Sequence, residues 1–170
     1  MKNILTNSLI ATIVSIILFF ILDKIDPKLN FNPIWGIVTS SIIYFFFIIR
    51  AGLQERKKAG GLLGLGEAFI ISFGVYAIVS LLNIFFLLAM IKMYPELMDI
   101  AKETSIEMIE KAMAMMGTSE NEIALQIEEH NVSQIDMFDL KTMIINWLGA
   151  LIFPGALYVL IPAFIVRKKA

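Results

Sequence analysis

Four long stretches without a charged residue limit the fold of this sequence more than any other feature: residues 4–22, 34–49, 68–91 and 142–166. A helix needs about 20 apolar residues to cross the hydrocarbon core of a bilayer. Three stretches are long enough, and the second is too if it starts at Asn32 and Pro33, which suit a helix N-cap and first turn. The sequence therefore predicts an all-α fold, a four-transmembrane-helix bundle. Its helices are expected at residues 4–22, 33–53, 67–91 and within 142–170, where a basic tail follows.

The composition agrees with a membrane protein. Hydrophobic residues make up 58% of the 170-residue chain and charged residues only 17%, whereas soluble domains are nearer half apolar and about a quarter charged. The first stretch is longer than the apolar core of a signal peptide and no small-residue cleavage site follows it, so it is expected to remain as a helix. The chain has no cysteine, which excludes disulfides and thiolate metal sites.

The distribution of Lys and Arg predicts the orientation, because short basic loops stay in the cytoplasm. The loop after the second helix and the C-terminal tail are the basic segments, with Arg50, Arg56, Lys57, Lys58, Arg167, Lys168 and Lys169. Both termini are therefore expected in the cytoplasm and residues 92–141 outside it. Trp35, Tyr94 and Trp147 agree with this orientation, since they fall at the outer ends of their helices, where amphipathic rings favour the interface.

A glycine-rich segment, KKAGGLLGLGEAF at residues 57–69, precedes the third helix. A phosphate-binding loop of the Walker type needs a lysine and a hydroxyl after its glycines. Here the lysines come first, the segment has no Ser or Thr, and Glu67 places a carboxylate where an anionic ligand would bind at the helix N-terminus. The segment is therefore predicted to be a basic loop that bends into the third helix, with Glu67 in its first turn.

The same segment carries a resemblance to a known family. A Gly-Gly pair and a small-residue turn lead into EAF at the start of the third hydrophobic helix. A long acidic insert contains MGTSENEIALQIEE, and proline interrupts the last helix. These features resemble the uncharacterised bacterial membrane family called domain of unknown function 4199, over essentially the whole chain. The resemblance implies an integral protein of the bacterial cytoplasmic (inner) membrane and no established activity.

Residues 92–141 form an acidic insert with eleven carboxylates and four lysines, a net charge of −7. Carboxylates recur at helical spacing over residues 96–110, and apolar residues occupy a separate face. Gly117 is expected to end this helix, and Ser119 with Glu122 to form a capping box for a second helix. A third helix, capped by Ser133 and Asp136, is expected to lead into the last span. The insert is thus predicted to be a helical hairpin outside the membrane.

No cofactor or metal site is predicted. The acidic stripe lacks the spacing of an EF-hand and is expected to be solvated. Methionines concentrate in the insert, and His130 is the only histidine, so a site for a soft metal such as Cu(I) stays an open alternative to apolar packing. The expected partners are the lipid bilayer and, through residues 95–130, a second copy of the chain or an envelope protein, with no nucleic acid.

The four uncharged stretches contain no Asp, Glu, Lys, Arg or His, which argues against proton relays, ion-coupled transport and acid–base catalysis inside the membrane. Asn83 and Asn146 are placed to hydrogen-bond between the third and fourth helices. Pro154 and Gly155 are expected to break the last helix, as a structural kink or, in a transporter, beside a substrate site. Small residues four apart suit close helix contact: Gly36 with Ser40, Ala68 with Ser72, and Ala11 with Ser15.

Two functions remain compatible with these features. The preferred hypothesis is a non-catalytic membrane protein, not an enzyme, that assembles through its acidic outer hairpin. The alternative is a small permease or channel subunit for an uncharged or hydrophobic solute, in which the break at Pro154 would border the path.

Overall fold

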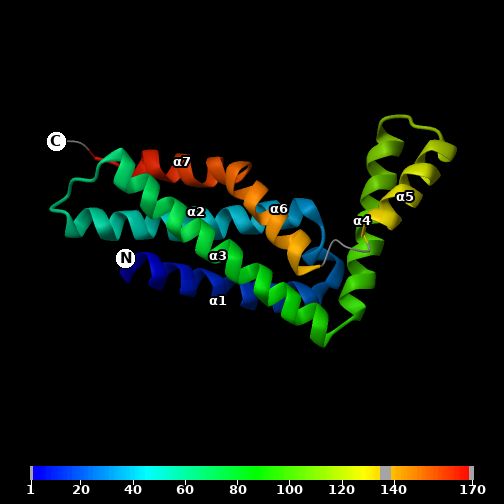
Figure 1. Ribbon diagram of the computed structural model, residues 1–170, viewed down its shortest axis with the longest axis horizontal. Helices are drawn as coiled ribbons and strands as arrows, with labels where there is room; N and C mark the ends of the chain where they lie inside the picture. The colour runs from blue at the N-terminus through cyan, green and yellow to red at the C-terminus, as the bar shows by residue number, and fades with distance from the viewer. Residues whose placement is uncertain (1, 135–138, 169–170) are drawn as a thin grey trace.

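The computed structural model describes residues 2–134 and 139–168, and in that part of the chain the fold is all-helical, with one isolated β-bridge. Figure 1 shows the order of the helices along the chain. Their bounds are α1 Lys2–Ile25, a 3₁₀ helix η1 Pro27–Asn30, α2 Pro33–Lys58, α3 Leu65–Met93, α4 Glu96–Met115, α5 Glu120–Gln134, α6 Leu140–Ile152 and α7 Gly155–Val166.

The centre of the bundle is the pair α2 and α3, which contact each other and are flanked by α1 on one side and α7 on the other. Their buried residues form one apolar core that includes Ile48 of α2, Val75 and Val79 of α3, and Val159 of α7. These β-branched side chains are fully or almost fully buried, so the inner faces of the four helices hold the bundle together by close packing.

The outer faces of the bundle are apolar as well, which is the pattern of a helical membrane protein. Helices α1, α2 and α3 are each long and apolar enough to cross a membrane. Helices α6 and α7 pass the same test only together, as one broken span that bends by 40°. The fold therefore has three helices that could span a membrane, or four spans if the bent pair counts as one.

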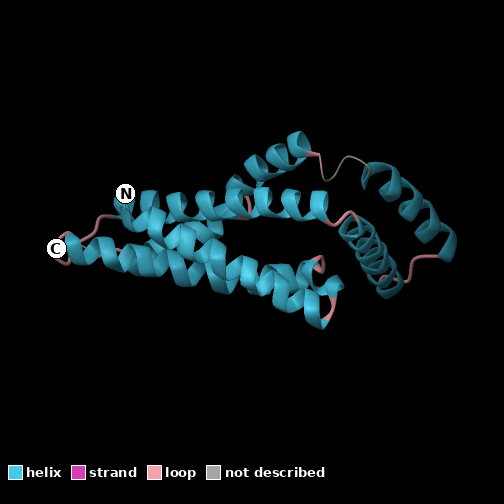
Figure 2. Ribbon diagram, turned by 90° about the horizontal axis from the view of Figure 1, so that it is seen from below, coloured by secondary structure: helices cyan, strands magenta, loops and turns pink. Residues whose placement is uncertain are grey.

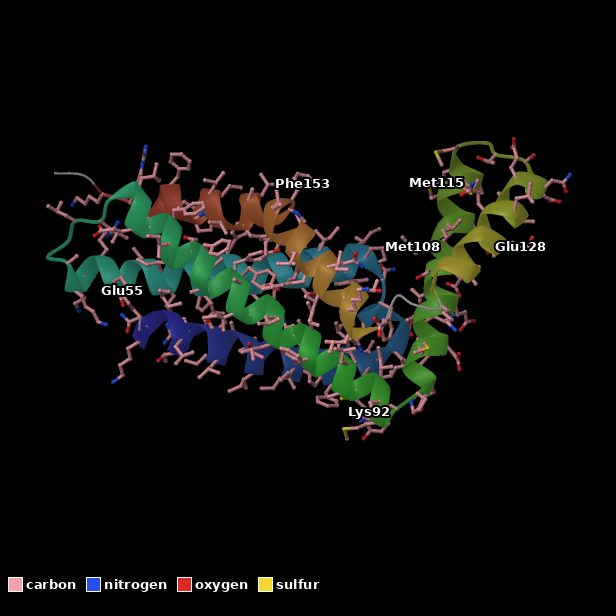
Figure 3. The ribbon with its side chains drawn as sticks, viewed as in Figure 1. Glu55, Lys92, Met108, Met115, Glu128 and Phe153 are labelled. Carbon is pink, nitrogen blue, oxygen red and sulfur yellow. The ribbon has the colours of Figure 1, made fainter. Side chains whose placement is uncertain are left out.

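Both ends of the chain lie at one end of the bundle, and helices α4 and α5 lie at the other (Figures 1 and 2). Helix α4 contacts α3 and η1, whereas α5 contacts only α4 among the described elements. Met115 and Glu128, labelled in Figure 3, lie on this hairpin away from the bundle. The turn between α4 and α5 contains Gly117 with φ of 74°, a backbone conformation that glycine adopts without strain.

The helices extend beyond the predicted apolar ranges at several ends. Helix α1 continues to Ile25, past Asp23 and Lys24, and α2 continues from residue 53 to Lys58. The predicted bounds marked where the apolar run stops, but helices continue into the polar zone because charged side chains with good helix propensity are stable there. The predicted cap by Ser133 is wrong, because Ser133 lies within α5, and Asp136 lies outside the described residues. Helix α6 is instead capped by Asp139, whose carboxylate accepts a hydrogen bond from Lys141 N–H at 3.0 Å.

Candidate functional site

The glycine-rich segment before α3 joins α2 to α3 and also contacts the C-terminal end of the chain. Gly60 and Gly61 adopt φ of 72° and 93° and turn the chain. Leu63 then pairs with Lys168 near the C-terminus through two backbone hydrogen bonds of 2.9 Å. Glu67 lies in the first turn of α3 and accepts a hydrogen bond from Gly64 N–H at 3.0 Å. The carboxylate thus satisfies a free backbone donor at the start of this helix.

The predicted hydrogen bond between Asn83 and Asn146 is not present among the described residues. Asn83 lines a cavity of about 210 Å³ together with residues of α1 and α2, such as Phe19 and Thr39, and its Oδ1 is buried without a partner. Asn146 lines a different cavity, described below. The pairing fails because Asn83 is turned towards α1 and α2, while α6 meets α3 one helical turn away, at Ser80.

The contacts that join α6 and α3 involve an indole and a phenol. Trp147 Nε1–H donates to Ser80 Oγ at 2.9 Å, and the Tyr76 hydroxyl donates to the carbonyl of Ala150 at 3.3 Å. The sequence placed Trp147 at the membrane interface, but it gave no indication of this bond, since Ser80 is one of several hydroxyl residues in the apolar helices.

Three tyrosines from three helices form an aromatic cluster in the bundle. The ring centroids of Tyr44 and Tyr76 are 5.0 Å apart, and the ring of Tyr158 lies 5.3 Å from the first and 5.6 Å from the second. The Tyr158 hydroxyl also lies 2.8 Å from Ser41 Oγ, which links α7 to α2. The cluster could not be predicted from the sequence, because the three residues are far apart in the chain and have no shared spacing.

The break between α6 and α7 opens a cleft beside these aromatic residues. Helix α7 packs against α2 and α3, but α6 contacts only α3 and α7 among the described elements, so space remains between α2 and α6. This α2–α6 cleft encloses about 500 Å³. Its lining is Phe31, Tyr44, Tyr76, Ser80, Ile84, Ala101, Ser105, Met143, Asn146, Trp147 and Ala150, none of which carries a charge.

Helix α4 closes one end of the cleft with Ala101 and Ser105. Its buried residues Leu97, Ala101 and Thr104 fix it against the bundle. The interface also has two ion pairs, since Lys28 Nζ of η1 lies 2.5 Å from Glu107 and 3.2 Å from Glu103. The acidic stripe of α4 was expected to be solvated, and four of its five carboxylate residues are exposed: Glu96, Asp99, Glu103 and Glu110. The ion pairs of Glu103 and Glu107 with Lys28 were not predicted.

The ion pairs shift the protonation of their members in opposite directions. The hydrogen bonds to Glu107 and Glu103 raise the pKa of Lys28 above 10.5, and the hydrogen bond from Lys28 lowers the pKa of Glu107 below 4.5. Lys28 and Glu107 are therefore both charged over the whole neutral range. No group of three or more His, Asp or Glu residues is arranged to hold a metal ion within the described ranges.

Comparison with known proteins identifies the family of the chain. Residues 6–168 match the family described as "Protein of unknown function (DUF4199)". No curated protein and no solved structure matches the chain. Because the match covers nearly every residue, from the first helix to the basic tail, the chain belongs to the DUF4199 family.

Proposed function

We propose that this protein is a four-span protein of the bacterial cytoplasmic membrane, with both termini in the cytoplasm and the hairpin α4–α5 outside. Support comes from the distribution of charge over the bundle. The basic segments, residues 50–58 and 167–168, lie at the end of the bundle where α2 meets the C-terminus, near Glu55 in Figure 3. Helices α4 and α5, which carry most carboxylates of the insert, lie at the opposite end. Basic segments favour the cytoplasmic side.

The function of this protein is assembly, through the hairpin, and not catalysis. The observation that carries this proposal is the position of α5, which contacts α4 and no other described element. Apolar side chains on this outlying part of the hairpin remain exposed: Leu125 is 62% exposed, Met116 74% and Met115 87%. Apolar side chains outside the membrane are typical of a contact surface for another protein, either a second copy of the chain or an envelope protein.

Site-specific photocrosslinking in intact cells tests this proposal. A benzoylphenylalanine at position 125 is expected to yield a defined protein adduct. The same group at Ile13, which is 56% exposed on the apolar part of α1, serves as the matched control and is expected to yield no defined adduct. An adduct of twice the chain mass identifies a second copy, and any other defined mass identifies a different partner.

The substitution Leu125→Glu provides the second arm of the experiment. With a crosslinker at the neighbouring exposed position Glu128, the added charge is expected to remove the adduct while the protein still accumulates in the membrane. Contact through the apolar surface would be disproved if Leu125→Glu left the adduct unchanged, or if position 125 formed no more adduct than position 13.

A further inference from the structure

We propose that the α2–α6 cleft binds a small uncharged ligand, a flat conjugated ring that carries carbonyl oxygens. This inference does not depend on the partner proposed for the hairpin, because the ligand would occupy the bundle and not the surface of α5.

The size of the cleft suits such a ligand. Sites for small molecules in proteins usually enclose about 300 to 1,000 Å³, and this cleft encloses about 500 Å³. Its origin is the 40° bend between α6 and α7, which leaves α6 without a contact to α2 in the described part of the chain. Phe153 at the bend points away from the bundle in Figure 3 and is exposed, so its side chain does not fill the space.

The walls of the cleft favour a planar ring. Aromatic side chains come from four separate places in the fold: Phe31 before α2, Tyr44 in α2, Tyr76 in α3 and Trp147 in α6. Two of them are held in position by hydrogen bonds, Trp147 to Ser80 and Tyr76 to Ala150. Phe31 and Trp147 are partly exposed, so these rings can make stacked or edge-to-face contact with an aromatic ligand. Tyr44 and Tyr76 are buried in the aromatic cluster and form the floor of the cleft. Because Trp147 is already fixed by its hydrogen bond, binding does not have to order it.

The polar groups of the cleft favour an uncharged ligand with acceptor atoms. No charged residue lines the cleft, and an ion in such surroundings would lose hydration without gaining a counter-charge. Asn146, an exposed residue of α6, presents an amide that can donate hydrogen bonds. A carbonyl oxygen on the ring would accept from that amide, whereas a lipid acyl chain has no acceptor to offer it.

Fluorine NMR can test this inference, because the chain has two tryptophans and they lie in different places. Trp147 lines the cleft, whereas Trp35 is 47% exposed near the start of α2 and serves as an internal control. Protein labelled with 6-fluorotryptophan in detergent micelles is titrated with menadione, a naphthoquinone with two carbonyl oxygens. The absence of cysteine removes the thiol addition that would otherwise complicate quinone titrations. The Trp147 resonance is expected to shift to saturation while Trp35 shifts little.

Two variants and a second probe assign the result to the cleft. Ser105→Phe places a ring in the cleft from α4 and is expected to weaken menadione binding at least tenfold. Asn146→Leu changes an exposed residue and is expected to weaken menadione but not 2-methylnaphthalene, which has a similar shape without carbonyls. An unchanged Trp35 resonance in ligand-free protein shows that each variant folds, whereas the Trp147 resonance is expected to move because both substitutions lie in the same cleft.

The inference is overturned if both tryptophan resonances shift together and without saturation, since that pattern reports partitioning into the micelle. Equal affinity for menadione and 2-methylnaphthalene would also overturn it, because the cleft would then be a purely apolar site of the kind that lipid chains fill. Crosslinking at position 125 is a separate readout, so either proposal can fail without the other.

Discussion

At the residue scale, two helices approach each other closely at Gly52 of α2. A Cβ atom at this position would lie 2.7 Å from Cγ2 of Val166, the last residue of α7, whose side chain is fully buried. Arg56 adds a hydrogen bond of 3.2 Å to the carbonyl of the same valine. Glycine at position 52 therefore allows the C-terminal end of α7 to pack directly on the backbone of α2.

We expect Gly52→Ala to destabilise the bundle by about 1–3 kcal/mol, the usual cost of overpacking a filled core. The measurement is the free energy of unfolding in mixed micelles as the fraction of SDS is raised. Gly36→Ala is the matched control, because no atom lies within 4 Å of its added Cβ, and removing a helical glycine there should stabilise by about 0.5–1 kcal/mol. Equal effects of the two substitutions would show that the contact with Val166 is not tight.

The contrast between these glycines shows what helical spacing can and cannot predict. Ala68 and Ser72 were predicted to lie in close helix contact, and both are fully buried. Gly36 satisfies the same four-residue rule but faces open space. Spacing identifies residues that share one side of a helix, but it contains no information on which side a neighbour covers. The predicted hydrogen bond between Asn83 and Asn146 was wrong for the same reason.

At the scale of elements, the position of α4 depends on residues distant in the sequence. Its buried face contacts a small apolar cluster around Met90 and Ile91, and its acidic face meets Lys28. The sequence predicted a hairpin at this place and its turn at Gly117. It did not predict that α4 contacts η1, because only the folded bundle brings the two together.

We expect Lys28→Glu to loosen α4, because it places like charges beside Glu103 and Glu107. The measurement is the distance distribution between spin labels at Ile25→Cys and Met116→Cys, which should broaden in this variant. Lys28→Glu combined with Glu107→Lys should narrow it again. Lys24→Glu makes the same change of net charge on an exposed residue at the end of α1 and is expected to leave the distribution unchanged.

The same distances should respond to pH only at its extremes. The pKa of Glu107 is lowered, so its contribution is complete above 4.5 and is lost as the pH falls through the folded value. The pKa of Lys28 is raised, so its contribution is complete below 10.5 and is lost as the pH rises through the folded value. A transition between pH 6 and 9 would therefore contradict the ion pairs as the cause.

At the scale of the whole molecule, the uncharged stretches predicted the helical class and the apolar segments, because a bilayer imposes a minimum length on any helix that crosses it. The arrangement of the segments was not predictable in the same way. The break predicted in the last stretch at Pro154 and Gly155 is confirmed, since α6 ends at Ile152 and α7 begins at Gly155. The cleft beside α6 was not predicted. Breaks can be recognised from Pro154 and Gly155, whereas the direction of the bend depends on packing against α2 and α3.

The proposed orientation makes a prediction that single thiols can test, because the chain contains no cysteine. Ser119 lies in the turn before α5 and Lys58 at the end of α2, and both are exposed. Ser119→Cys should react with a membrane-impermeant maleimide in intact cells, whereas Lys58→Cys should react only after the membrane is opened. The reverse pattern would place the hairpin in the cytoplasm. It would then exclude envelope proteins as partners of α5, because the apolar side chains of the hairpin would face the inside of the cell.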